Sequence, residues 1–114
     1  MFRKEPLMAM FQRKFTGDFD ALLAKVEKIV MNGSISASME ERVDYKTAQG
    51  RCSVRVFERY SYAGGNRVSM NVTLFQAGPE IHLCAITSGG SQGLFFKLNT
   101  WGEETFLETL EKEL

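Results

Sequence analysis

The sequence predicts a two-layer α+β domain in which an antiparallel meander sheet carries two helices on one face. Apolar residues recur at helical spacing in an early and a late segment, and they alternate with polar residues in the segments between. With 114 residues, of which 44% are hydrophobic, the chain is long enough to bury a core as a single domain over residues 1–114. Residues 1–8 precede the first regular pattern, and we expect them to form a disordered extension; because Met8 and Met10 follow Pro6, an alternative start is the other interpretation.

The first two predicted elements are a short strand and a helix. Residues 10–15 alternate weakly, which favours a strand. Thr16, Gly17 and Asp18 form a good helix-entry cluster, after which apolar residues share one helical face up to Val30. An Asn-Gly pair at 32–33 ends this helix.

Four further strands are predicted by an alternation of period two. They cover residues 34–45, 51–62, 67–75 and 81–88. The side chains expected to face the helices on the first three of these strands are Ile35, Ala37, Met39, Val43 and Tyr45; Cys52, Val54, Val56, Tyr60 and Tyr62; and Val68, Met70, Val72 and Leu74.

A continuous apolar face requires one particular register, because a slip of one residue turns every side chain of a strand to the other face. A three-residue loop at 63–65 matches core residues in the second hairpin. The predicted pairs are Val43–Cys52, Asp44–Arg51 and Glu40–Arg55; Tyr60–Val68, Val56–Val72 and Val54–Leu74; and Leu74–Ile81, Val72–Leu83, Met70–Ala85 and Thr73–His82. The alternative first hairpin, which opposes Arg42 to Arg55, is disfavoured by charge.

The end of the chain predicts a second helix. Thr100 and Glu103 have the capping-box spacing, and apolar residues follow at helical intervals. The apolar run 94–98 is either another strand or the approach to this helix. The element order β-α-β-β-β-β-α is that of a TATA-binding-like fold, and a helix-grip fold, whose closing helix is normally longer, is the alternative.

Composition narrows the classes of function. The 14 basic residues balance the 14 acidic ones, which argues against a protein that coats nucleic acid. We expect a cytoplasmic protein, because no stretch is long and apolar enough to span a membrane and the N-terminus lacks a secretory signal. Cys52, Cys84 and the single His82 are too few for a zinc site, and we expect two reduced thiols on opposite sheet faces.

Four segments of the chain resemble a known family. They are GDFD at 17–20, NGSISAS at 32–38, FERYSYAGGNRVS at 57–69 and AITSGGSQGLFFKLNTWGEETF at 85–106. These strings are similar to a family of small uncharacterised bacterial proteins, mainly from Gram-positive anaerobes, that is known as a domain of unknown function. The resemblance implies a bacterial cytosolic protein and carries no activity, so it assigns no functional residue.

The sheet face that the helices leave open is the main candidate surface. On the predicted register it displays five of the seven arginines, namely Arg42, Arg51, Arg55, Arg59 and Arg67. Guanidinium groups favour bidentate contact with carboxylate or phosphate. The candidate ligand-binding residues are therefore Arg55, Arg59, Arg67 and Asn71 of this face, joined by Ser88, Ser91 and Gln92 of the Gly-rich loop, whose backbone N–H and hydroxyl groups would suit an anion. An ordinary solvated face is the alternative, and Phe57, Phe75 and Ile86 on the same face favour a face-to-face homodimer.

Two weaker features would suit an enzyme. Glu58 interrupts the apolar side of its strand, where a buried carboxylate would suit a general acid, although a β-bulge or a position near the sheet margin explains such a break more simply. The Gly-rich loop 88–93 lacks the ending of a phosphate-binding loop, and one histidine gives no hydrolase triad. We name no catalytic residue, cofactor or metal ligand. The predicted function is a non-enzymatic, self-associating interaction module. One alternative is the binding of an anionic small molecule or nucleic acid across the Arg-bearing face. The other is an enzyme that uses Glu58 or the loop 88–93.

Overall fold

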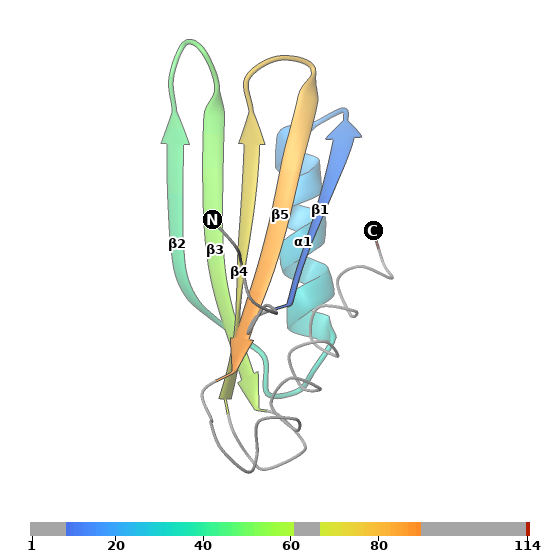
Figure 1. The fold of residues 1–114 in the computed structure, drawn as a ribbon, viewed down its shortest axis with the longest axis vertical. Coiled ribbons are helices and arrows are strands. Elements are labelled where there is room, and N and C mark those ends of the chain that lie inside the picture. Colours follow the sequence, from blue (N-terminus) through green and yellow to red (C-terminus); the bar gives the residue numbers. More distant parts are fainter. Residues whose placement is uncertain (1–8, 61–66, 90–113) are drawn as a thin grey trace, which may run out of the picture.

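The computed structural model describes residues 9–60, 67–89 and 114. These residues form one helix and a five-stranded antiparallel sheet (Figure 1). The elements are β1 (Ala9–Thr16), α1 (Phe19–Asn32), β2 (Ser38–Lys46), β3 (Arg51–Tyr60), β4 (Arg67–Gln76) and β5 (Glu80–Gly89), and the sheet order is β1-β5-β4-β3-β2. The α+β class and the four-stranded meander are thus confirmed. The second helix, the run 94–98, the loop at 63–65 and the extension at 1–8 lie outside the described residues.

Helix α1 begins and ends where the sequence predicts. Asp18 is its N-cap, and the carboxylate of Asp18 accepts a hydrogen bond from the backbone N–H of Asp20 at 3.1 Å. Gly17 links β1 to this cap with φ at 118°, a backbone conformation that favours glycine. The helix ends at Asn32, and the N–H of Gly33 donates to the carbonyl of Val30.

The core lies between α1 and one face of the sheet, and Figure 1 shows the helix behind the strands. The buried apolar residues of the helix are Phe19, Leu23, Val26 and Val30. They pack against alternate residues of the central strands, which are Phe57, Val68, Met70, Val72, Leu74, Ile81, Leu83 and Ala85. Leu114 is partly buried and packs against the same core. For β4 the predicted helix-facing side is therefore correct.

The predicted orientation of β3 is wrong. In the structure Val54 opposes Thr73, Arg55 opposes Val72 and Arg59 opposes Val68, one residue out of the predicted register. Every side chain of β3 is therefore on the face opposite to the expected one. The helix-facing set consists of Ser53, Arg55, Phe57 and Arg59, all buried.

The other two predicted hairpin registers are also corrected. The β4–β5 pairing is displaced by two residues, so that Leu74 opposes Leu83 and His82 opposes Phe75; the same faces still match. In the β2–β3 hairpin Arg42 opposes Arg55, which is the register that charge alone disfavours. Two carboxylates that flank Arg55 offset this like-charge pairing, as described below.

Strand β2 is shorter than predicted and contains a bulge. Residues 34–37 form a turn in which the N–H of Ala37 donates to the carbonyl of Ser34, and Ile35 is fully exposed. The pairing shifts between Met39 and Glu41, so one extra residue reverses the alternation. Beyond the bulge Val43 therefore faces away from the helix, contrary to prediction.

Gly50 allows the close turn between β2 and β3. The N–H of Thr47 donates to the carbonyl of Gly50 at 2.7 Å, which closes the hairpin. A Cβ atom at Gly50 would lie 2.5 Å from the carbonyl oxygen of Gln76, so the backbone of the β4 end approaches too closely for any side chain. This contact holds the β2–β3 turn against the neighbouring hairpin.

Candidate interaction surface

The sheet face opposite α1 is covered by no described element, and we call it the open face. Three rows of side chains cross it from β2 to β1. They are Tyr45, Cys52, Phe75, His82 and Lys14; Val43, Val54, Thr73, Cys84 and Gln12; and Glu41, Val56, Asn71, Ile86 and Met10. The centre of this face is more apolar than the Arg-bearing, Ser-rich face that the sequence predicts.

Large apolar side chains of the open face are exposed to solvent. Phe75 is 47% exposed, Tyr45 63% and Val43 40%, and Met10 and Ile86 are exposed at the β1 side. Isolated exposed apolar residues are common, but here they stand in adjoining rows of one sheet. Several large exposed apolar side chains on one face are typical of an interaction surface.

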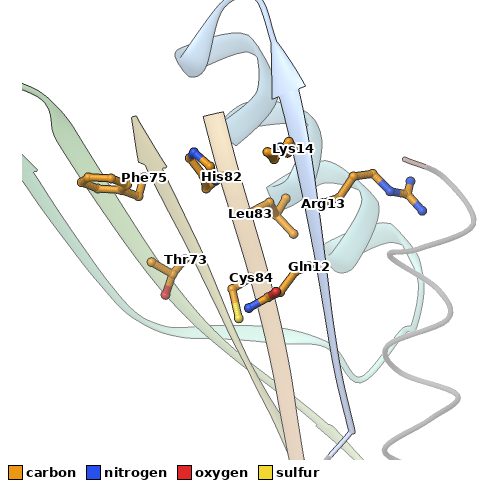
Figure 2. A pocket seen from close by; sticks show the side chains of 8 residues that line it. All are labelled: Gln12, Arg13, Lys14, Thr73, Phe75, His82, Leu83 and Cys84. Carbon is orange, nitrogen blue, oxygen red and sulfur yellow. The ribbon is translucent and has the colours of Figure 1, made fainter. Parts of the chain in front are cut away.

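Phe75 stands between two hollows of the open face. The larger, of about 470 Å³, is shown in Figure 2 and is lined by Gln12, Arg13, Lys14, Thr73, Phe75, His82, Leu83 and Cys84. The smaller, of about 220 Å³, is lined mainly by the β2–β3 turn, with Tyr45, Cys52 and Phe75. The Phe75 and His82 rings lie 6.4 Å apart in a tilted arrangement. An exposed aromatic side chain and the space for another therefore lie side by side.

The polar groups at the end of the open face are largely paired with one another. Arg67 forms ion pairs with Glu58 and Glu40. The Ser69 and Ser88 hydroxyls lie 2.8 Å apart and share a hydrogen bond. Glu58 is thus an ion-paired group on the open face, rather than a buried acid, and the bulge expected at its position lies on neighbouring β2.

The structure does not bring the predicted ligand-binding residues together. Arg67, Asn71 and Ser88 are on the open face, as expected. Arg55 and Arg59 are buried on the helix side, and Arg42 and Arg51 also belong to that side. Ser91 and Gln92 lie outside the described residues. The predicted cluster of five arginines on the open face is therefore wrong.

Arg55 lies between the helix and the sheet in a carboxylate cage. Its side chain is 4% exposed, and Nε donates to Glu27 Oε2 at 2.6 Å while Nη1 lies 3.0 Å from Asp44 Oδ1. Burial by itself would lower the pKa of Arg55, but the hydrogen bonds to the two carboxylates outweigh burial and raise it. The guanidinium therefore stays charged and links α1 to β2 and β3.

The carboxylates that face the arginines are held in their charged form. Hydrogen bonds from Ser53, at 2.6 Å, and from Arg55 hold the pKa of Asp44 below its usual value of 3.8. Closer to the helix N-terminus, Arg51 donates to Asp20 at 2.7 Å and lies 4.0 Å above the Phe19 ring. The hydrogen bond from Arg51 likewise lowers the pKa of Asp20. These pairs belong to the helix–sheet layer and not to the open face.

Cys52 and Cys84 are on the same face, contrary to the prediction of opposite faces. Cys52 opposes Phe75 and Cys84 opposes Thr73, so β4 lies between the two cysteines. Strands two apart are separated by about 10 Å, which exceeds the Cα distance that a disulfide spans. Both thiols are free and half-buried. An intramolecular disulfide remains unexpected, for this new reason.

The described ranges hold neither a metal-binding cluster nor a membrane-spanning helix. No group of three or more His, Cys, Asp or Glu side chains is placed to hold a metal ion in residues 9–60 and 67–89. Within the same ranges, no helix has the length and apolar character needed to cross a membrane.

Comparison with known proteins identifies the family. A family model matches residues 8–114, which is nearly the whole chain. The chain belongs to DUF6054, a family of unknown function. No curated protein matches the chain. The resemblance to a domain of unknown function is thereby confirmed, whereas membership of DUF6054 says nothing of its expected distribution among Gram-positive anaerobes.

Sequence reasoning places Phe75 on the open face of this DUF6054 chain but misses most of the apolar patch around it. It assigns Tyr45, Val54 and Val56 to the core because they alternate with polar residues. The available signal is that β3 has apolar residues at both parities, with Phe57 opposite in parity to Val54 and Val56. Such a strand can turn either side toward the helix. Its orientation is then decided by whether acidic residues of other elements can pair with its arginines.

Proposed function

We propose that this chain is a non-enzymatic interaction module that self-associates by stacking its open face on that of a second copy. The observation that carries the proposal is the position of Phe75, exposed and apolar, between two hollows of the same face. A two-fold contact uses the same patch on both copies, so a surface with both a projecting ring and a space for one is self-complementary. Each Phe75 would enter the hollow beside the other.

The composition of the surface supports a polypeptide partner rather than an anion. Aromatic residues and methionine are enriched in the centre of protein interfaces, and charged residues are depleted there. Tyr45, Phe75, Ile86 and Met10 fit this composition. The anionic-ligand and nucleic-acid alternatives relied on an arginine cluster, whose members Arg42, Arg51, Arg55 and Arg59 belong to the helix side.

Light scattering and sedimentation at micromolar concentration test the proposal. We expect the wild-type chain to be larger than a monomer, and Phe75→Glu to weaken association by about a hundredfold, because a carboxylate would be buried at the centre of the contact. Ile35→Glu is the matched control, since Ile35 is fully exposed and lies away from the open face. A monomeric wild type, or a Phe75→Glu chain that associates like the wild type, would contradict face-to-face stacking.

A further inference from the structure

The outer edge of β2 is a second candidate surface, because no described strand pairs with it. Strand β2 is an edge strand of the sheet, and each of its residues from Glu40 to Lys46 is exposed. An edge strand presents backbone N–H and C=O groups that another strand can pair with. Natural edges are commonly protected by charges, so the pattern of charge decides whether a given strand can pair there.

The hairpin turn fixes which residues of β2 direct their backbone groups outward. Because Thr47 and Gly50 form a hydrogen-bonded pair, the alternation of an antiparallel ladder makes Tyr45 and Val43 hydrogen-bonded to β3. The backbone N–H and C=O groups of Arg42, Asp44 and Lys46 then point away from the sheet. A pairing strand must use these residues.

Few two-fold registers are compatible with this alternation, and charge and overlap together separate them. An axis at Tyr45 opposes Asp44 to Lys46 of the other copy, but it overlaps only residues 44–46 of β2. A two-fold axis at Arg42 places Arg42 opposite its own copy, and an axis at Asp44 places Asp44 opposite its own copy; both oppose like charges. An axis at Val43 instead places Arg42 of each chain opposite Asp44 of the other, and Val43 opposite Val43. This register makes two opposite-charge pairs and one apolar pair.

The side chains of Arg42 and Asp44 are available for contact with a second copy. Arg42 makes no ion pair with another residue in the described ranges. The carboxylate of Asp44 is 49% exposed although it already contacts Ser53 and Arg55. Because Arg42 and Asp44 both belong to the helix side of β2, opposed side chains meet on one face of the extended sheet.

The other edge of the sheet lacks this complementarity. Strand β1 carries Arg13 and Lys14 and no acidic residue. A second copy of β1 placed beside it would therefore meet only cations or neutral residues. The two edges of one sheet thus differ in their capacity to pair with themselves.

We propose that two copies of this chain join through β2, antiparallel about a two-fold axis at Val43, to form a ten-stranded sheet with five strands from each copy. Arg42 of each chain contacts Asp44 of the other. Both helices then lie on one side, and the two open faces form one surface of double width. This edge pairing is distinct from face-to-face stacking, because it depends on the outward backbone groups and charged side chains of Arg42 and Asp44 on β2, whereas stacking is centred on Phe75 of β4.

Sedimentation velocity with charge variants tests edge pairing. We expect Arg42→Glu to weaken the edge contact by about tenfold or more, because it places the introduced carboxylate opposite Asp44 at both ends of the two-fold contact. Lys25→Glu is the matched control, since it makes the same change of charge at an exposed position of α1. An equimolar mixture of Arg42→Glu and Asp44→Lys chains should associate again as mixed pairs. If Asp44→Lys does not fold, the contrast between Arg42→Glu and Lys25→Glu suffices.

The two contacts are separated by combining variants. The Phe75→Glu variant removes stacking and should still form a two-chain species through β2. If the further change Arg42→Glu abolishes that species, edge pairing is supported even where stacking fails. If Arg42→Glu in the Phe75→Glu background has the same mass and association constant as Lys25→Glu, edge pairing is overturned. A Phe75→Glu chain that is already monomeric at high micromolar concentration also overturns it, whereas stacking remains supported.

Discussion

Strands β3 and β4 are hydrogen-bonded neighbours that turn opposite kinds of side chain toward α1. From β4 the helix receives Val68, Met70, Val72 and Leu74, each fully buried. From β3 it receives Ser53, Arg55, Phe57 and Arg59. The comparison teaches that a strand with apolar residues at both parities is not oriented by hydrophobic alternation alone.

The polar half of the helix–sheet layer explains the orientation of β3. Glu27 and Asp20 on the α1 element meet Arg55 and Arg51 directly, and Asp44 of β2 completes the contacts of Arg55. The long stems of these arginines also cover apolar surface, as Arg51 does over the Phe19 ring. With β3 reversed, the arginines would lose these partners, and Phe57 would lose its place in the core.

The largest expected effect on stability distinguishes one phenylalanine on β3 from one on β4. Phe57 on β3 is fully buried, whereas Phe75 on β4 is 47% exposed. We expect Phe57→Ala to lower the free energy of unfolding by about 3 to 5 kcal/mol, because it leaves a cavity under α1. Phe75→Ala should cost less than about 1.5 kcal/mol in the monomer.

Urea denaturation at a concentration that keeps both variants monomeric makes this measurement. If Phe57→Ala were as mild as Phe75→Ala, β3 would have the orientation that the sequence predicts, with both phenylalanines on the open face. Phe57 would then belong to the solvent side.

A smaller effect compares two arginines. The Arg55 side chain is 4% exposed between two carboxylates, and that of Arg67 is 55% exposed beside Glu58 and Glu40. We expect Arg55→Met to cost about 2 kcal/mol, less than a fully buried pair, because both carboxylates that it abandons keep contact with water. Arg67→Met should cost less than about 0.5 kcal/mol.

Thermal and urea unfolding of these two variants report on the same comparison. Equal, small effects would mean that the cage around Arg55 does not orient β3. The two methionine variants have the same charge change, so general electrostatic effects cancel in the difference.

The sequence is sufficient for elements whose pattern has one solution. Helix α1 has a single apolar stripe and an Asp cap, and β4 has apolar residues at one parity only, so both are predicted correctly. The reversal in β2 depends on an extra residue at the Met39–Glu41 bulge, which an alternating pattern does not mark. The β3 orientation depends on Glu27, which is distant in sequence and becomes a neighbour only through folding.

The sequence predicts the location of the candidate surface correctly, but it predicts the wrong side chains on it. The face opposite the helix is open, as the two-layer argument requires, and Phe75 and Ile86 are on it. The open face carries Val54 and Val56 where arginines of β3 are predicted, and this follows entirely from the one-residue difference in β3 register. The residues on a sheet surface are therefore predicted correctly only when the side of each strand that faces the helix is predicted correctly.

The smallest expected effect is the pH dependence of the Asp44 contacts. The pKa of Asp44 is below 3.8 in the folded chain, so the unfolded chain binds more protons as the pH falls. The stabilisation by charged Asp44 is fully present above its unfolded pKa and is lost as the pH falls from that value through the folded pKa. We therefore expect the difference in unfolding free energy between wild type and Asp44→Asn to be constant from about pH 7 to 5 and to shrink below about pH 4.

The Ser53→Ala background assigns the origin of this pH dependence. The hydrogen bond from Ser53 is the largest cause of the lowered pKa of Asp44, so its removal should bring the wild-type and Asp44→Asn curves closer at neutral pH. Denaturant titrations from about pH 3 to 7 measure both pairs of curves. If Ser53→Ala leaves the difference unchanged, Ser53 does not hold the Asp44 carboxylate. The polar end of the contrast between β3 and β4 would then rest on the contacts of Arg55 with Glu27 and Asp44.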